Sequence, residues 1–73
     1  MSYEAFCKRF GYKLKYYRNY KGLTQEELAE KLEISDYHYV SKIESGKCNI
    51  TFKTLFKLSQ ALDTEPFNFF QFK

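Results

Sequence analysis

The stretch from Leu23 to Glu44, LTQEELAEKLEISDYHYVSKIE, constrains the fold more than any other, because it holds the signals of two short helices only a few residues apart. Thr24 is followed three residues later by Glu27, which is the pattern of a capping box at a helix start. The apolar residues of this first helix then recur at helical spacing, at Leu28, Ala29 and Leu32. A helix, a tight turn and a second helix are therefore predicted over about residues 24–45.

The second helix of this pair is predicted over about residues 36–45. Ser35 or Asp36 supplies its N-cap, because short polar side chains accept hydrogen bonds from the first free backbone N–H groups. Val40 and Ile43 are three residues apart and point inward. The outer face is left to polar and aromatic side chains, namely Tyr37, His38, Ser41 and Lys42.

Further helices are predicted on both sides of this pair. The first is capped by Ser2 and ends before Gly22. Its apolar stripe consists of Phe6, Phe10, Leu14 and Tyr17. The later helix is capped by Thr51, and its stripe consists of Phe52, Leu55, Leu58, Ala61 and Leu62. Beyond it, Thr64 is expected to cap a short aromatic tail that begins at Pro66, and the tail is too short to separate a helical turn from a strand.

The composition indicates one domain over residues 1–73. The chain is 44% hydrophobic, with seven tyrosines and eight phenylalanines, which is enough apolar surface for a core and argues against disorder. No apolar run approaches the roughly 20 residues that span a bilayer. The N-terminus has no signal-peptide pattern, so a cytoplasmic location and no membrane partner are expected.

The residue types give no support to metal, cofactor or enzyme chemistry. Cys7 and Cys48 are too few and too far apart for a disulfide framework, and they are expected to be reduced and packed. With His38 as the only histidine, no zinc site can be assembled. A nucleophile–base pair and a glycine-rich phosphate loop are both missing from the sequence. We therefore expect no metal, no cofactor and no catalytic residues.

Charge is distributed unevenly along the chain. Residues 1–21 carry six Lys/Arg against Glu4, residues 22–46 carry two lysines against six acids, and residues 47–73 carry four lysines against two acids. The net charge is +3. Binding to phosphates requires basic groups beside the contact face rather than a uniformly basic body, and this distribution permits it.

Four segments together resemble the phage repressor/Cro-type (XRE-like) helix-turn-helix family. They are GYKLKYYRNYKG, LTQEELAEKL, VSKIESGK and ITFKTLFKLSQAL, and the resemblance covers roughly residues 10–70. It implies an all-α fold, a compact four- to five-helix bundle of the lambda-repressor-like kind, with its third helix in the major groove of DNA. The length and layout look like those of small stand-alone regulators.

The resemblance also implies roles for individual residues. The candidates for base contacts are Asp36, Tyr37, His38, Ser41 and Lys42. The candidates for phosphate contacts are Gln25, Lys47 and Asn49. Arg18 and Glu44 match an ion pair of the family that holds the recognition helix. Other roles stay open for three of the candidates for base contacts. Asp36 is also a candidate helix cap, Tyr37 can cover the core, and an exposed His38 can be an ordinary polar residue.

Two departures from the family bear on the turn. The family usually has Gly at the position of Glu33, so Glu33 must adopt a left-handed backbone at a cost of about 1 kcal/mol or turn differently. The segment between Leu32 and Val40 is also one residue longer than usual. The register from Asp36 to Tyr39 depends on where that extra residue goes.

The function expected from the sequence is sequence-specific binding to double-stranded DNA by a homodimer that regulates transcription, most simply as a repressor. The dimer surface is sought in the tail, at Phe67, Phe69, Phe70 and Phe72, with helix 4 as a further contributor. These phenylalanines could instead close the core. The alternative function is an antitoxin-like protein–protein module, with a toxin as partner and DNA binding as a secondary property.

Overall fold

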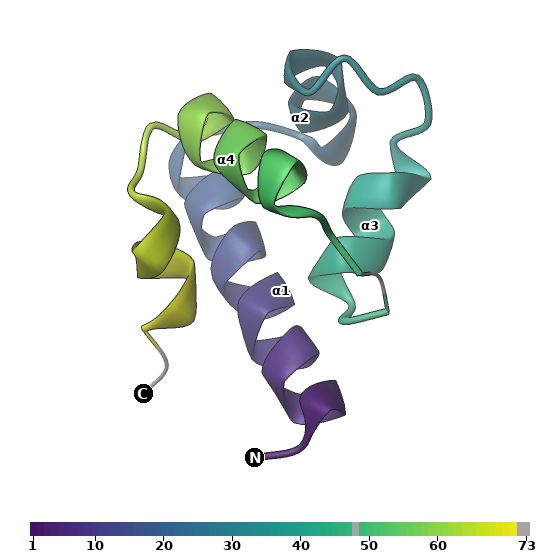
Figure 1. Ribbon diagram of the computed structural model, residues 1–73. Helices are drawn as coiled ribbons and strands as arrows, with labels where there is room; N and C mark the ends of the chain where they lie inside the picture. The colour runs from purple at the N-terminus through teal and green to yellow at the C-terminus, as the bar shows by residue number, and fades with distance from the viewer. Residues whose placement is uncertain (48, 72–73) are drawn as a thin grey trace.

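The computed structural model describes residues 1–47 and 49–71, and the regular elements in this part of the chain are all helices. In chain order the elements are α1 (Tyr3–Tyr20), α2 (Gln25–Lys31), α3 (His38–Glu44), α4 (Phe52–Ala61) and the 3₁₀ helix η1 (Pro66–Phe70) (Figure 1). The predicted all-α class is confirmed. Within the same residues no helix is both long and apolar enough to cross a membrane. Cys48, expected to be a reduced and packed thiol, and Phe72, a candidate for the dimer surface, lie outside the described residues.

Helix α1 is the longest element and forms the support of the fold. It begins where predicted, because the Ser2 hydroxyl accepts the backbone N–H of Ala5 at 3.0 Å. It ends at Tyr20, and Gly22 follows with a φ of +74°. Helices α3 and η1 pack on different sides of it (Figure 1). Helix α1 therefore lies between α3 and the aromatic segment η1.

In the turn between α2 and α3 the chain keeps the usual geometry, with a left-handed residue at the position of Glu33. The capping box at the start of α2 is present, with Glu27 N–H donating to Thr24 at 3.0 Å and Thr24 N–H donating to the Glu27 carboxylate at 2.8 Å. Glu33 adopts a left-handed backbone, with φ of +60°. Its backbone N–H donates to the carbonyl of Glu30 at 2.9 Å, which closes the end of α2.

Helix α3 begins at His38, two residues later than predicted. The N-cap position is held by Tyr37, which makes no side-chain capping bond, so the prediction of Ser35 or Asp36 at this position was wrong. The reason is a turn that precedes the helix, in which Asp36 Oδ1 accepts the backbone N–H of His38 at 3.0 Å. In the same turn the Asp36 carbonyl accepts the N–H of Tyr39 at 3.1 Å.

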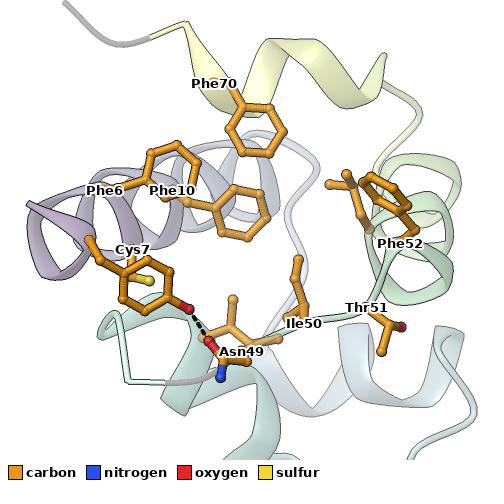
Figure 2. A pocket seen from close by; sticks show the side chains of 11 residues that line it. Phe6, Cys7, Phe10, Asn49, Ile50, Thr51, Phe52 and Phe70 are labelled. Atoms are coloured by element: carbon orange, nitrogen blue, oxygen red, sulfur yellow. Dashed lines mark hydrogen bonds between the residues drawn. The ribbon is translucent and has the colours of Figure 1, made fainter.

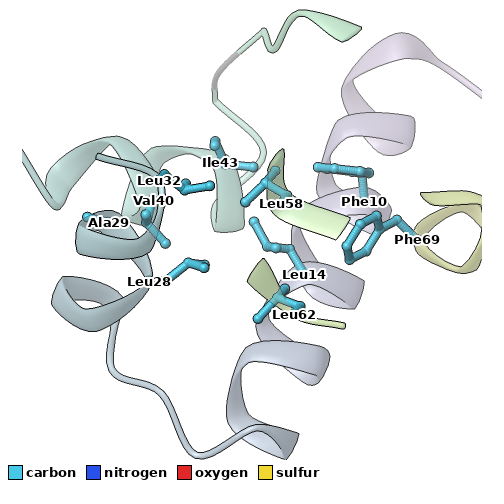
Figure 3. Packing of buried hydrophobic residues seen from close by; sticks show 10 residues of the cluster. All are labelled: Phe10, Leu14, Leu28, Ala29, Leu32, Val40, Ile43, Leu58, Leu62 and Phe69. Atoms are coloured by element: carbon cyan, nitrogen blue, oxygen red, sulfur yellow. The ribbon is translucent and has the colours of Figure 1, made fainter. Parts of the chain in front are cut away.

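The core is a contiguous cluster contributed by all five elements (Figure 3). Its members are Phe10, Leu14, Leu28, Ala29, Leu32, Val40, Ile43, Leu58, Leu62 and Phe69. Phe52 was expected on the inner stripe of α4, but it is 90% exposed, so that expectation was wrong. Leu58 and Leu62 fix the inner face, and Phe52 lies about 240° around the helix from Leu58 at roughly 100° per residue.

The aromatic tail forms a helical turn rather than a strand. Glu65, not Thr64, stands at its N-cap position; the Thr64 hydroxyl instead accepts the side-chain amide of Asn68 at 2.8 Å, so the prediction of a Thr64 cap was wrong. Phe69 is fully buried and packs edge-on against Phe10, with ring centroids 5.4 Å apart. Phe69 therefore closes the core, and its assignment to a dimer surface is corrected.

Candidate DNA interface

Helix α3 packs against the core through two buried residues of its own, and its opposite side is exposed to solvent. Val40 and Ile43 are 0% and 1% exposed. On the outer side, Tyr37, His38 and Lys42 are exposed and Ser41 is half-buried, as the sequence pattern predicted. A short helix supported along one side and open along the other fits the major groove of B-DNA, which is wide enough for an α-helix.

The backbone of α1 supports the last turn of α3 directly. A Cβ atom added to Gly11 would lie 2.4 Å from the carbonyl oxygen of Ile43 and 2.5 Å from that of Glu44. Only glycine permits this approach, because there is no room for a methyl group. The sequence reasoning missed this contact. Its signal was a glycine inside a helical apolar stripe, between Phe10 and Leu14.

An ion pair fixes the C-terminal end of α3 to α1. The Arg18 Nε donates to Glu44 Oε2 at 2.5 Å and its Nη2 donates to Oε1 at 3.2 Å, a two-point contact between a guanidinium and a carboxylate. The side chains are 9% and 5% exposed. The Arg18 Nη1 also donates to the carbonyl of Leu23 at 2.7 Å. The pair thus joins α1, the loop before α2 and α3.

Gln25, a candidate for a phosphate contact, takes part in the same network. Its Nε2 donates to Glu44 Oε1 at 3.0 Å, and its side chain is half-buried. A side-chain amide carries two N–H groups, so one donor is used by Glu44 and the second can serve another acceptor. The network therefore places the first residue of α2 beside the last residue of α3.

The N-terminal end of α3 carries a compact polar and aromatic cluster. Asp36 Oδ1 accepts the backbone N–H of His38 at 3.0 Å and lies 2.9 Å from His38 Nδ1. The Tyr37 and His38 rings stack, with centroids 4.6 Å apart and planes 23° apart. The backbone N–H and then the ring of His38 hold the pKa of the Asp36 carboxyl below its ordinary value of 3.8. The Asp36 carboxylate is therefore engaged by its own chain.

The turn that ends α3 packs against Lys8 of α1 and carries Lys47. The helix ends in a tight turn, in which Lys47 N–H donates to the carbonyl of Lys42 at 2.9 Å and Gly46 has φ of +80°. A Cβ on Gly46 would lie 2.7 Å from Cγ of Lys8. Lys8 in α1 therefore lies beside Gly46, the residue before Lys47, and both lysines are exposed. Sequence reasoning missed Lys8, whose only signal was its position off the apolar stripe.

Asn49, the third phosphate candidate, is exposed and tied to the start of α1. Its side-chain oxygen accepts the hydroxyl of Tyr3 (Figure 2). The same contact borders an apolar pocket of about 360 Å³ between α1, η1 and the start of α4. Phe6, Phe70 and Phe52 lie around this pocket (Figure 2).

Besides Phe6 of α1, which is 37% exposed, the exposed phenylalanines of the described residues lie on α4 and η1. Phe52 is 90% exposed and Phe56, four residues on and hence on the same side of α4, is 56% exposed. In η1, Phe67 is 58% exposed and Phe70 is 36% exposed. We call these four residues the aromatic surface. Isolated exposed apolar residues are ordinary, but several on neighbouring elements indicate an interaction surface.

Two helices joined by a tight turn, with the second exposed along its outer side, define a helix-turn-helix domain. The chain belongs to the HTH_3 helix-turn-helix family, whose sequence model matches residues 14–69. This confirms the resemblance to the phage repressor/Cro-type family stated from the sequence. An uncharacterised HTH-type transcriptional regulator of Methanocaldococcus jannaschii is 46% identical over 48 residues, which are 66% of this chain and 71% of that protein.

Two solved structures show the same arrangement of helices. The restriction-modification controller protein C.AhdI from Aeromonas hydrophila is 38% identical, with a TM-score of 0.84, over 89% of this chain and 97% of that chain. The controller protein C.Esp1396I is 33% identical, with a TM-score of 0.76, over 90% of this chain and 86% of that chain. The latter structure is a tetramer of that protein in complex with its natural 35 base-pair operator.

Proposed function

We propose that this chain is a transcriptional regulator that binds double-stranded DNA in a sequence-specific manner, as a homodimer, and represses transcription from the promoters its sites overlap. The observation that carries the proposal is the position of α3, which is anchored to α1 by Gly11 and the Arg18–Glu44 pair while its outer side stays open. The operator complex of the similar C.Esp1396I supports it.

In the proposed complex α3 enters the major groove and its outer side chains read base edges. Lys42 is the strongest candidate for a guanine, whose O6 and N7 accept from a cation, and Ser41 can donate or accept. Tyr37 and His38 act at the start of the helix, where recognition residues of helix-turn-helix proteins lie. Asp36 is assigned a different role from the one expected, since its carboxylate already accepts from His38.

Phosphate contacts are proposed on both sides of α3. Gln25 at the start of α2 has a second N–H available beyond its bond to Glu44. At the other end of α3, Lys47 and Lys8 supply cations, and Asn49 supplies a side-chain amide that can donate. Contacts at both ends of a helix fix its register along the groove but carry no sequence information themselves.

The aromatic surface is proposed as the dimer contact. Burying a phenylalanine that is otherwise exposed gains about 1.5–3 kcal/mol, and in a twofold dimer each residue is used twice. The molecule measures 32 × 21 × 21 Å along its principal axes. Two such bodies side by side can place their α3 helices about 34 Å apart, one turn of B-DNA. The tetramer of C.Esp1396I shows that a similar protein assembles with its own copies.

Selection of bound sequences from a random DNA pool tests the central claim. A regulator of this kind enriches a palindromic site, and its affinity falls steeply between about 50 and 200 mM salt because counterions are released from the phosphates. A module that works mainly through a protein partner, such as the antitoxin alternative, binds DNA only weakly, and the affinity of its apolar protein interface does not fall with salt. Transcription from a promoter carrying the enriched site, with and without the protein, then separates repression from activation.

Two lysine variants test the proposed contacts. Lys47→Ala should weaken binding to all sites alike and flatten the salt dependence by about one counterion. Lys31→Ala removes the same charge from the opposite end of α2 from Gln25 and should leave the salt slope unchanged. Equal effects of the two variants would show that net charge, rather than a contact at Lys47, determines affinity.

The dimer contact is tested by the mass of the protein in solution as a function of concentration. Phe52→Ser together with Phe56→Ser should shift the equilibrium towards monomer and abolish cooperative binding to two half-sites. Tyr20→Ala removes another exposed aromatic ring, which is 79% exposed, from the end of α1 and serves as control. If the double Phe variant dimerises as the wild type does, the dimer contact does not lie at Phe52 and Phe56.

A further inference from the structure

The polar end of α3 contains a histidine whose two ring nitrogens have different tasks. His38 Nδ1 lies 2.9 Å from Asp36 Oδ1, and the same oxygen accepts the backbone N–H of His38 at 3.0 Å. An ionised carboxylate can only accept hydrogen bonds. Nδ1 must therefore carry the hydrogen of this bond, which leaves the neutral ring with an unprotonated Nε2.

The ring is held in orientation as well as in tautomer. The Asp36 bond fixes one edge, and the Tyr37 ring stacks on one face with centroids 4.6 Å apart. Restraint comes from both neighbours although the His38 side chain itself is 67% exposed. An exposed side chain that is fixed by its neighbours loses little conformational entropy when it meets a ligand.

We propose that His38 determines specificity at one base position, by accepting through Nε2 a hydrogen bond from the exocyclic amino group of adenine or cytosine. The inference rests on the proposed function, because it places α3 in the major groove. There adenine N6 and cytosine N4 are the donors, whereas guanine O6 and N7 and thymine O4 are acceptors that face Nε2 unfavourably. Asp36 is a positioning residue, which acts through His38 and touches no base.

The proposal explains why an acidic residue can stand at a surface that faces phosphates. The Asp36 charge is unfavourable to DNA as a whole, and its use is to select the tautomer. Removing it should thus have two effects of opposite sign. Asp36→Ala should bind all DNA sequences more tightly, yet discriminate less at the position that His38 reads, because the ring is then free to present N–H at Nε2.

The experiment measures the affinity of each single-base variant of the selected site at pH 8, for the wild type and two substitutions. His38→Ala removes the ring, and His38→Phe keeps a ring able to stack on Tyr37 but has no nitrogen. Both should lose a preference of about tenfold for adenine or cytosine at the same one position, and keep the preferences elsewhere. Thermal melting of each variant checks that the exposed substitution leaves the fold intact.

Asp36 hydrogen-bonds the His38 ring, Tyr37 stacks on it and Lys42 lies one turn along α3. No titratable side chain of another helix hydrogen-bonds or ion-pairs with His38 in the described part of the chain.

The outcomes separate this inference from the function beneath it. If a site is selected but His38→Phe retains every base preference, the assignment of His38 is overturned and DNA binding by α3 stands. Unchanged discrimination in Asp36→Ala overturns the role of Asp36 as the residue that fixes the tautomer. If the wild type selects no site at all, both the inference and the proposed function fail.

Discussion

Replacing Arg18 with alanine is the sharpest test of how α3 is held. The substitution removes both hydrogen bonds to Glu44 and the bond to the Leu23 carbonyl. It leaves the Glu44 carboxylate, 5% exposed, with the single bond from Gln25. Leaving one member of a buried ion pair without its partner typically costs about 3–5 kcal/mol.

That loss is large compared with the stability of so small a domain. At roughly 0.05–0.15 kcal/mol per residue, a chain of 73 residues has a free energy of unfolding of about 4–11 kcal/mol. In domains of this size 1 kcal/mol corresponds to a shift of about 4–8 °C in Tm. Arg18→Ala should therefore melt at least about 12 °C below the wild type, and part of the protein should be unfolded at 37 °C.

The assay is thermal and urea unfolding followed by circular dichroism, with DNA affinity measured at a temperature where the variant is folded. Affinity of the folded fraction should fall much less than stability does, since Arg18 lies behind α3 and not on its outer side. Replacing both partners, Arg18→Met with Glu44→Leu, should recover much of the loss, because two apolar side chains leave no buried charge. A variant Arg18→Ala that melts normally but fails to bind DNA would refute the reasoning.

Three further substitutions test the fold and the turn. Gly11→Ala should destabilise the protein by about 1–3 kcal/mol, measured by urea unfolding, because the new methyl group would meet the Ile43 carbonyl at 2.4 Å. Glu33→Gly should raise Tm by a few degrees, since the residue has φ of +60° and a left-handed backbone costs about 1–2 kcal/mol; an unchanged or lower Tm would mean that the Glu33 side chain contributes more than its strain costs. The pKa of Asp36 is lowered in the folded state, so the stabilisation by its charge is fully present above the ordinary value of 3.8 and is lost as pH falls through the lowered pKa. Asp36→Asn should therefore have a lower Tm than the wild type at pH 7 and the same Tm once the pH is below the lowered pKa. A difference in Tm that does not change with pH would exclude the charge as its source.

Local signals in the sequence were sufficient to place most helix boundaries. The caps at Ser2, Thr24 and Thr51 each accept a hydrogen bond from a backbone group three residues on, so the signal and the structure lie within one turn. The start of α3 was predicted two residues too early, because a polar side chain before the helix makes a local hydrogen bond that is not a helix cap. Asp36 accepts from His38, only two residues on, which makes a turn before the helix rather than a cap of it.

Features that depend on two distant segments could not be read from one stretch of sequence. Gly11 is meaningful only because α3 crosses α1 at that residue, and periodicity within α1 says nothing about the crossing. Lys8 became a candidate only when Gly46 was found beside it. Phe52 and Phe69 are both apolar and both lie in the C-terminal half of the chain, yet Phe52 is exposed and Phe69 is buried. The orientation of each helix relative to the core determines which side chain is buried. Which bases the outer side chains of α3 contact stays a prediction.

The contact between Phe10 and Phe69 has a consequence for the order in which the molecule can assemble. These two rings come from opposite ends of the sequence, 59 positions apart, and neither can be shielded from water by its own helix. A growing polypeptide therefore cannot complete its interior until the ring at position 69 has left the ribosome. Until then the aromatic side chains of α1 are exposed to water, and chaperones or other incompletely folded chains can bind to them.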